Sequence, residues 1–147
     1  RKKSMTTLFP LPELPPKGLS LTQPWAYAVA QGLKKVENRK WKPSAAALNT
    51  RLAIHASMTY DPEGEAFLRK NGVVIPAEKI VHGAILGVVT LRNVVTRSVD
   101  PMFFGPFGWE LSDFLPLDTP IPCKGALSLW KIPPEVLALL LKQLEKA

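Results

Sequence analysis

The chain has 147 residues, of which 46% are hydrophobic and 21% are charged. This composition fits one globular domain and excludes a disordered tract. The longest apolar run, residues 83–91, is shorter than the ~18 residues that suggest a bilayer span, so we expect no membrane contact. A single cysteine excludes an internal disulfide and suits a reducing compartment. We expect a cytoplasmic monomer, with the nucleus as the alternative compartment.

The net charge of +7 is concentrated in the N-terminal part of the chain. Residues 1–56 contain ten Lys or Arg against two acidic residues, whereas residues 57–147 contain nine against ten. Five basic residues lie between Lys34 and Lys42, offset only by Glu37. A basic strip of this kind attracts polyanions, of which nucleic acid is the commonest. The alternative is a solvated strand edge whose lysines oppose aggregation.

The N-terminal part of the chain divides into an arm and the start of a folded domain. Residues 1–17 are basic and rich in proline, which predicts an extended arm because proline disfavours helices and central strands. A short strand over 18–21 precedes a helix over 23–31, which ends at Gly32 because glycine tolerates the left-handed conformation. Residues 35–41 are predicted to form a strand with four side chains on one face: Lys35, Glu37, Arg39 and Trp41.

Further strands are predicted over residues 51–57, 83–95, 109–115 and 124–131, with a turn over 120–122 and a helix over 63–70. Residues 101–108 form a loop that contains three phenylalanines. The strand over 83–95 is apolar on both faces and is therefore expected to be buried. Residues 133–147 are predicted to form a C-terminal helix that packs through Leu137, Leu140, Leu141 and Leu144. The pattern indicates an α+β fold with a small β-barrel and flanking helices.

The most specific pattern is G-x-K-x-x-E-x-R over residues 32–39, preceded by Q-P-W-A over residues 23–26. With these motifs and shorter segments up to Trp130, the chain resembles the ASCH family, a PUA-related group. The resemblance covers about residues 18–132 and leaves the N-terminal arm and the C-terminal helix outside it. It implies a PUA-like β-barrel with a cleft beside the motif and a role in nucleic-acid or nucleotide recognition.

The resemblance leaves the activity open. ASCH proteins include the C-terminal domain of a eukaryotic transcription coactivator, bacterial ribonucleases and a bacterial amidohydrolase that deacetylates N4-acetylcytidine. The amidohydrolase uses the lysine and the threonine of a K-x-x-T arrangement. Here Lys34 matches the lysine, but Glu37 replaces the threonine. Without that hydroxyl the acyl-enzyme route is not expected.

Three charged residues are the first candidates for a site. Arg39 can bind a phosphate through two hydrogen bonds, Lys34 adds a point charge, and Glu37 can accept from a base or act as a general base. The alternative is a structural ion pair between Glu37 and either cation. His55 and Ser57 share a strand face and are candidates for phosphate or base contacts. A structural role for His55 and nucleophilic catalysis by the pair are the alternatives.

Aromatic residues and metals complete the candidates. Lys40 and Lys42 are expected to contact phosphate, and Trp41 and Trp109 to stack on bases, with packing at the rim of the barrel as the alternative. Trp25 and Trp130 are assigned to the core. Two histidines and one cysteine match no familiar zinc spacing, so no metal or other cofactor is predicted. A divalent cation held loosely by Glu37, Glu110 or Asp113 is an alternative without a motif.

Three functions therefore remain open from the sequence. The first is a module that binds nucleotides or nucleic acid, with RNA or single strands favoured, through Lys34, Arg39 and their neighbours. The second is a hydrolase acting on RNA or on a modified nucleoside, with Lys34 and Glu37 as catalytic residues. The third is a protein-interaction domain of the coactivator type. Whether the chain is an enzyme is not decided by its residues.

Overall fold

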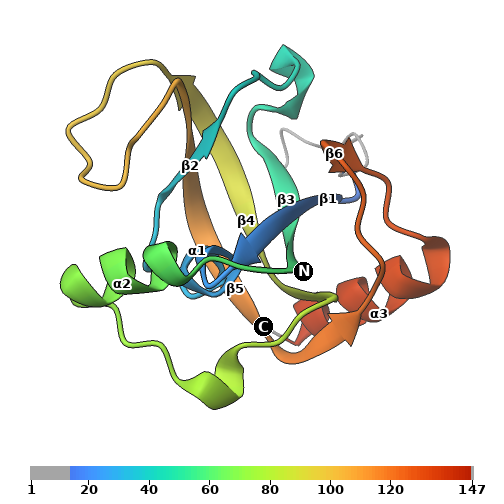
Figure 1. Cartoon of the computed structure of the whole chain (residues 1–147). Coiled ribbons are helices and arrows are strands. Elements are labelled where there is room, and N and C mark those ends of the chain that lie inside the picture. The colour runs from blue at the N-terminus through green and yellow to red at the C-terminus, as the bar shows by residue number, and fades with distance from the viewer. Residues whose placement is uncertain (1–13, 147) are drawn as a thin grey trace.

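The computed structural model describes residues 14–146, so most of the predicted N-terminal arm lies outside the described residues. Six strands form one sheet in the order β2-β5-β4-β3-β1-β6, in which only β1 and β3 run parallel (Figure 1). The strands are β1 (Lys17–Gln23), β2 (Val36–Arg39), β3 (Thr50–Tyr60), β4 (Ala84–Val95), β5 (Phe107–Pro122) and β6 (Leu129–Trp130). The helices are α1 (Trp25–Ala30), α2 (Pro62–Lys70) and α3 (Pro134–Glu145), with 3-10 turns at Ala45–Ala47 and Ala77–Lys79.

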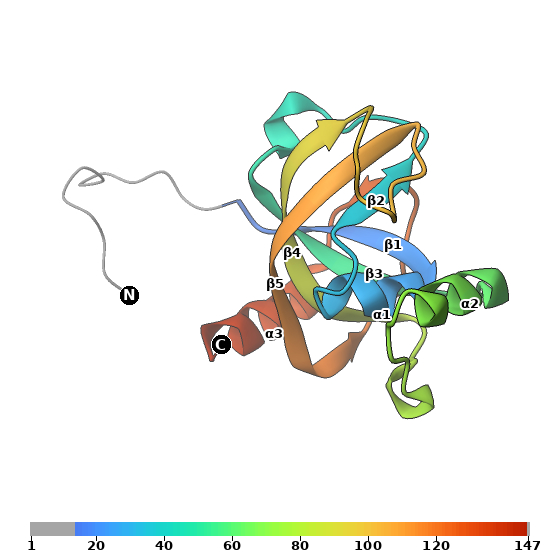
Figure 2. The same ribbon diagram turned by 90° about the vertical axis from the view of Figure 1, so that its left-hand side faces the viewer.

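The sheet curls into a half-barrel, which confirms the predicted α+β class. Pairing between β4 and β5 shifts register at three places along its length. Such irregularities bend strands and increase their twist, so two long strands can wrap around a core. Hydrogen bonding does not close the barrel, because β2 and β6 are the end strands of the sheet. Figure 2 shows α1 and α2 together at one end of the half-barrel and α3 away from them.

The main core lies between the curled sheet and α1. Its largest fully buried members come from α1 and from four strands: Leu19, Val29, Leu52, Ile54, Val89, Leu91 and Trp109. On β4 the residues from Ala84 to Leu91 are all buried, which confirms the expectation drawn from the apolar run over 83–95. Burial of this strand on both faces fits its central place in the sheet.

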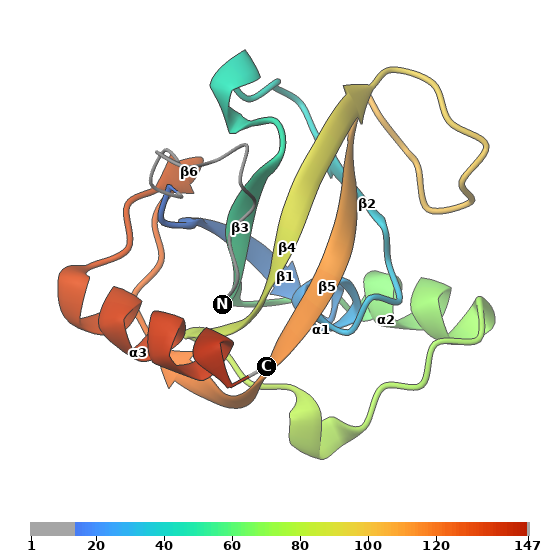
Figure 3. The ribbon, with the colours of Figure 1, turned by 180° about the vertical axis from the view of Figure 1, so that it is seen from behind.

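The C-terminal helix packs on a second apolar cluster formed with β4 and β5 (Figure 3). Leu140 is fully buried there, and Leu137 and Leu144 are partly buried against the same cluster. The predicted apolar face is therefore correct for three leucines and wrong for Leu141, which is 41% exposed. Leu141 lies one residue, or about 100°, around the helix from Leu140 and so turns away from the sheet.

Two sequence predictions in the C-terminal half were wrong. The segment 120–122 is no turn, because β5 continues through it and Ile121 pairs with Ile85. Residues 117–120 fall between the partners of Gly87 and Ile85, so Pro120 lies where the ladder is interrupted and needs no donor. The strand predicted over 124–131 shrinks to Leu129–Trp130. A proline only requires a position where its missing N–H is not needed for pairing. A β-bulge provides such a position as well as a turn does, so the prolines did not have to mark a turn.

We expect Leu140→Ala to lower the free energy of unfolding by about 2–5 kcal/mol, because a fully buried leucine leaves a cavity in the packing between α3 and the sheet. Leu141→Ala is the matched control on the adjacent residue and should change stability by less than about 0.5 kcal/mol. Urea denaturation of the three proteins measures both values. Equal destabilisation by the two substitutions would contradict the packing of α3 described above.

Candidate functional site

The three charged residues of the sequence motif form one ion network, in which Lys34 precedes β2 and Glu37 and Arg39 lie on it. Lys34 is 2% exposed and Glu37 is 9% exposed. The ammonium of Lys34 lies 3.3 Å from Glu37 Oε1 and donates to the carbonyl of Val36. Arg39 Nε lies 3.1 Å from Glu37 Oε2 without the alignment of a hydrogen bond. Each carboxylate oxygen of Glu37 therefore faces a cation, which offsets the cost of burying the charge.

The same network lines a cavity of about 330 Å³, here called the basic cavity. This volume lies at the lower end of the range of small-molecule sites. The polar and charged residues that line it come from β1, β2 and the segment before β2: Ser20, Thr22, Lys34, Glu37, Asn38 and Arg39. The structural ion pair that the sequence offered as an alternative is present, and its members also line a cavity. The ion pair and a binding role are compatible for the same side chains, and the binding role stays a prediction.

Trp25 packs against a buried cluster, as its assignment to the core implied, and also forms an aromatic wall of the basic cavity, which the sequence did not predict. Its indole Nε1 donates to Asp61 Oδ2 at 2.9 Å, and the ammonium of Lys34 lies 5.4 Å from its ring centroid. The hydrogen bond from Trp25 lowers the pKa of Asp61 below its usual value. Gly64 of α2 packs so closely that an added Cβ would lie 2.7 Å from the indole. The orientation of Trp25 thus depends on α2, a contact distant in sequence.

Phe104 borders the same cavity and is 59% exposed. Asn38 of β2 positions the loop that carries it: its amide donates to Met102 O at 3.0 Å, and its Oδ1 accepts from Phe104 N at 2.7 Å and Gly105 N at 3.0 Å. The ring of Phe104 also meets Phe67 of α2 edge to face, with centroids 5.3 Å apart. Sequence reasoning noted this loop of phenylalanines but did not place it in the site.

His55 is buried and both of its ring nitrogens are engaged. Nε2 lies 2.7 Å from Cys123 O, and because a carbonyl only accepts, this nitrogen carries the hydrogen. Nδ1 then accepts from Ser20 Oγ at 2.9 Å, and Ser20 Oγ accepts from Trp130 Nε1 at 3.2 Å. Burial lowers the pKa of His55, against the opposing effect of the hydrogen bond to Cys123. His55 is therefore neutral and satisfied, and it offers no free nitrogen to a phosphate.

His55 and Ser57 line a second cavity of about 610 Å³, and of the sequence candidates only these two lie there. Lys34, Glu37 and Arg39 therefore line a different cavity from His55 and Ser57. The two cavities nevertheless share Ser20, whose carbonyl accepts from Arg39 Nη2 at 2.9 Å while its hydroxyl bonds His55. Cys123 also lines the second cavity, and burial raises the pKa of its thiol, which disfavours a reactive thiolate.

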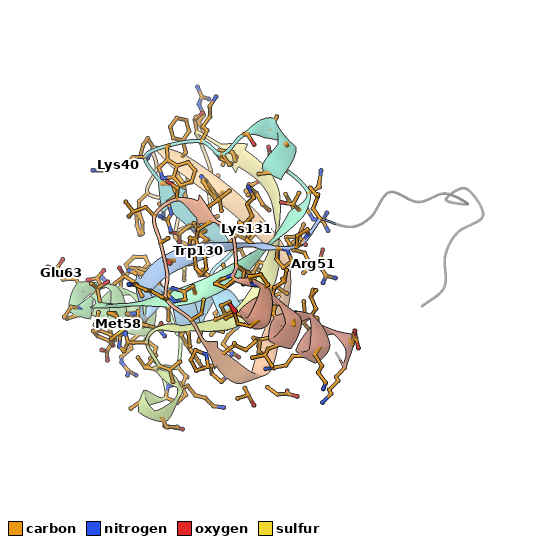
Figure 4. All side chains as sticks on the ribbon, turned by 90° about the vertical axis from the view of Figure 1, so that its right-hand side faces the viewer. Lys40, Arg51, Met58, Glu63, Trp130 and Lys131 are labelled. Atoms are coloured by element: carbon orange, nitrogen blue, oxygen red, sulfur yellow. The ribbon has the colours of Figure 1, made fainter. Side chains whose placement is uncertain are left out.

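The remaining candidates divide into exposed lysines and buried rings. Lys40 and Lys42 are exposed beyond the end of β2, and Figure 4 shows Lys40 on the same side of the molecule as Glu63 of α2. Trp109 has no exposed surface, so the prediction that it stacks on a base is wrong. Trp41 is partly buried and meets Trp109 edge to face, with centroids 4.8 Å apart. Trp41 packs against the edge of the core, which is close to the predicted alternative of packing at the rim, whereas Trp109 lies inside the core itself.

The acidic residues considered for a cation do not gather. Within residues 14–146, no group of three or more His, Cys, Asp or Glu side chains is arranged to hold a metal ion. Asp113 instead pairs with Arg92 on the surface, and Glu37 faces two cations.

Within residues 14–146, no helix has the length and apolarity to cross a membrane.

We expect the imidazole of His55 to titrate below its ordinary pKa of 6.5. The sign follows from linkage: below pH 6.5 the unfolded chain binds a proton that the folded chain does not, so the free energy of unfolding falls as the pH falls. A titration of the two histidine ring signals by NMR measures the pKa, with His55→Asn to assign them. A His55 pKa of 6.5 or higher would contradict the buried, neutral ring.

Comparison with known proteins identifies the family. The family model of the ASCH domain matches residues 19–104, more than half of the chain. The crystal structure of ASCH from Zymomonas mobilis is 19% identical, with a TM-score of 0.58, over 87% of this chain and 94% of that one. A mutant of the same protein, with a tyrosine replaced by phenylalanine, is also 19% identical with a TM-score of 0.58, over 88% and 98% of the two chains.

A second mutant of that protein, with a serine replaced by alanine, is 18% identical, again with a TM-score of 0.58, over 90% of this chain and 98% of that one. At such low identity these structures support the fold alone. A search of curated proteins finds no match. The half-barrel with its three helices is consistent with the PUA-like architecture expected from the motifs. The match over residues 19–104 shows that the chain belongs to the ASCH domain family.

Proposed function

We propose that this protein binds single-stranded nucleic acid, with RNA favoured, and receives a base or an extruded nucleotide in the basic cavity. The observation that carries the proposal is the buried network of Lys34, Glu37 and Arg39 at a cavity bordered by Trp25 and Phe104. Charged groups beside aromatic rings suit a ligand that combines a flat base with an anionic backbone.

The charge balance of the network favours an anionic ligand group. Two cations face one carboxylate, so one positive charge is left over at the cavity. The Nη1 group of Arg39 takes part in no hydrogen bond among the described residues, and the side chain is 21% exposed. A guanidinium with free donors binds phosphate oxygens well. Lys40 and Lys42 extend the positive potential beyond the cavity.

The aromatic residues supply a surface for a base. Phe104 is exposed at the cavity, and the loop that carries it is hydrogen-bonded to Asn38. A ring held in place before binding loses little conformational entropy when a base stacks on it. Polar groups at the cavity, among them Glu37 and the hydroxyl of Thr22, can accept from or donate to the edge of the base.

Binding ranks ahead of hydrolysis because of the surroundings of Glu37. Each of its carboxylate oxygens already faces a cation, which leaves only the remaining lone pairs for a hydrogen bond from a base. The described lining of the basic cavity holds no second carboxylate, histidine or cysteine that could share the proton transfers of a hydrolysis. Glu37→Gln separates the two functions. If the protein only binds, the variant changes the affinity for RNA and neither protein forms a product. If the parent turns over RNA and the variant binds it without turnover, hydrolysis replaces the proposal.

We expect Phe104→Ala to weaken binding to RNA oligonucleotides by about 1–3 kcal/mol, because a stacking surface is lost. The dependence of affinity on salt should stay the same, since stacking releases no counterions. Fluorescence anisotropy at several salt concentrations measures both quantities. Val99→Ala is the control, because Val99 lies between β4 and β5 like Phe104, is fully exposed and does not line the basic cavity. An unchanged affinity for Phe104→Ala would remove this ring from the interface.

Replacement of Lys40 and Lys42 by serine should weaken binding to all sequences alike. Each lost phosphate contact should reduce the slope of the log–log salt plot by about 0.7 for a single strand. The control removes the same charge from α3 and its C-terminal end, with Lys142 and Lys146 replaced by serine. Equal effects of the two pairs would mean that only the net charge matters. Undetectable binding by the parent protein at low salt would contradict the proposed function itself.

A further inference from the structure

A bulge between β1 and β3 gathers three hydroxyl groups beside the basic cavity. Leu21 pairs with Ala56 and Gln23 pairs with Tyr60, so residues 57–59 of β3 lie opposite Thr22 alone. Bulges of this kind redirect side chains and are frequent beside functional sites. Here Thr59 Oγ1 lies 2.9 Å from Thr22 Oγ1 and 2.9 Å from Ser57 Oγ. We call Thr22, Thr59 and Ser57 the hydroxyl row.

The hydroxyl row connects the two cavities. Thr22 lines the basic cavity, Ser57 lines the second cavity, and Thr59 hydrogen-bonds both of them. Ser20 lines both cavities, so the two adjoin at this residue. Because the hydrogen bonds of the row are exposed, its hydroxyls can exchange partners with a ligand that crosses from one cavity to the other.

The second cavity combines an apolar surface with a cation. Met58 is 77% exposed and Leu127 is 91% exposed, and both border the cavity together with the exposed Lys124. In Figure 4 Met58 lies on the same side of the molecule as Lys40, whereas Arg51 lies on the opposite side. Two exposed apolar side chains can pack on a base or a sugar, and the ammonium of Lys124 can contact a phosphate.

We propose that the ligand is a strand of at least two linked nucleotides, with one in the basic cavity, the next in the second cavity, and the connecting sugar-phosphate backbone on the hydroxyl row. The inference rests on the proposed function and specifies its ligand. A free nucleoside would fill the basic cavity and leave Lys124 and the hydroxyl row without a role. Hydroxyl groups and lysines are among the usual donors to phosphate and sugar oxygens.

The test compares ligands of increasing length. Affinities are measured for nucleoside 5′-monophosphates, dinucleotides and homopolymeric RNA oligonucleotides with the parent protein and two variants. Lys124→Ser should weaken dinucleotide and oligonucleotide binding roughly tenfold, and Thr59→Val about three- to tenfold, with monophosphate binding unchanged. The controls are Lys142→Ser, which removes the same charge from α3, and Thr119→Val, an exposed residue of β5 that hydrogen-bonds Gln143 through its main chain.

The outcomes separate the inference from the function on which it rests. Loss of affinity for linked nucleotides alone, with both controls unaffected, supports the inference. The inference is overturned if monophosphates and oligonucleotides bind equally well and neither Lys124→Ser nor Thr59→Val changes the affinity. The basic cavity would then remain a site for a single nucleotide. An equal loss with Lys142→Ser also overturns the inference, because the effect would then be one of net charge. If no nucleotide or oligonucleotide binds at low salt, both proposals fail.

Discussion

The carboxylate of Glu37 between the two cations Lys34 and Arg39 is the constraint on which the rest of this site depends. A carboxylate that is 9% exposed is costly to bury alone, and each of its oxygens faces a positive charge. The network also reaches β1, because Arg39 Nη2 donates a hydrogen bond to the carbonyl of Ser20. β2 and β1 are not neighbours in the sheet, so this contact ties two strands that backbone pairing leaves apart.

The place where the half-barrel stays open is therefore also the place where its polar groups gather. Elsewhere the inner face of the sheet is filled by apolar side chains from α1 and the long strands. At the open side, charged and hydroxyl groups of β1 and β2 replace them, and Asp61 at the start of α2 supports the aromatic wall. One architectural feature, incomplete closure, thus accounts for both the space of the basic cavity and the polar side chains that line it.

Local patterns in the sequence predicted much of the fold and part of the site. The apolar run of β4, the helix stop at Gly32 with φ of 74°, and the charged motif were all visible in short windows. The burial of Trp109 was not predicted because it follows from the pairing of Trp109 with Glu37 on β2, and these two strands are far apart in the sequence. The contact of Trp25 with the cavity was missed for the same reason, since Asp61 and Gly64 orient the ring from distant parts of the sequence. The hydroxyl row depends on a bulge, which no periodicity reveals.

The hydrogen bonds of Asn38 have a consequence for how ligand preference can change in this fold. Its amide bonds only main-chain atoms of the loop, at Met102, Phe104 and Gly105. The path of the loop at these positions is thus fixed independently of the side chain at position 104. A different aromatic, polar or charged side chain can be presented at the same point in space without rebuilding the scaffold. A single substitution at position 104 would therefore change the surface offered at the cavity, while the main chain of the loop keeps its hydrogen bonds to Asn38.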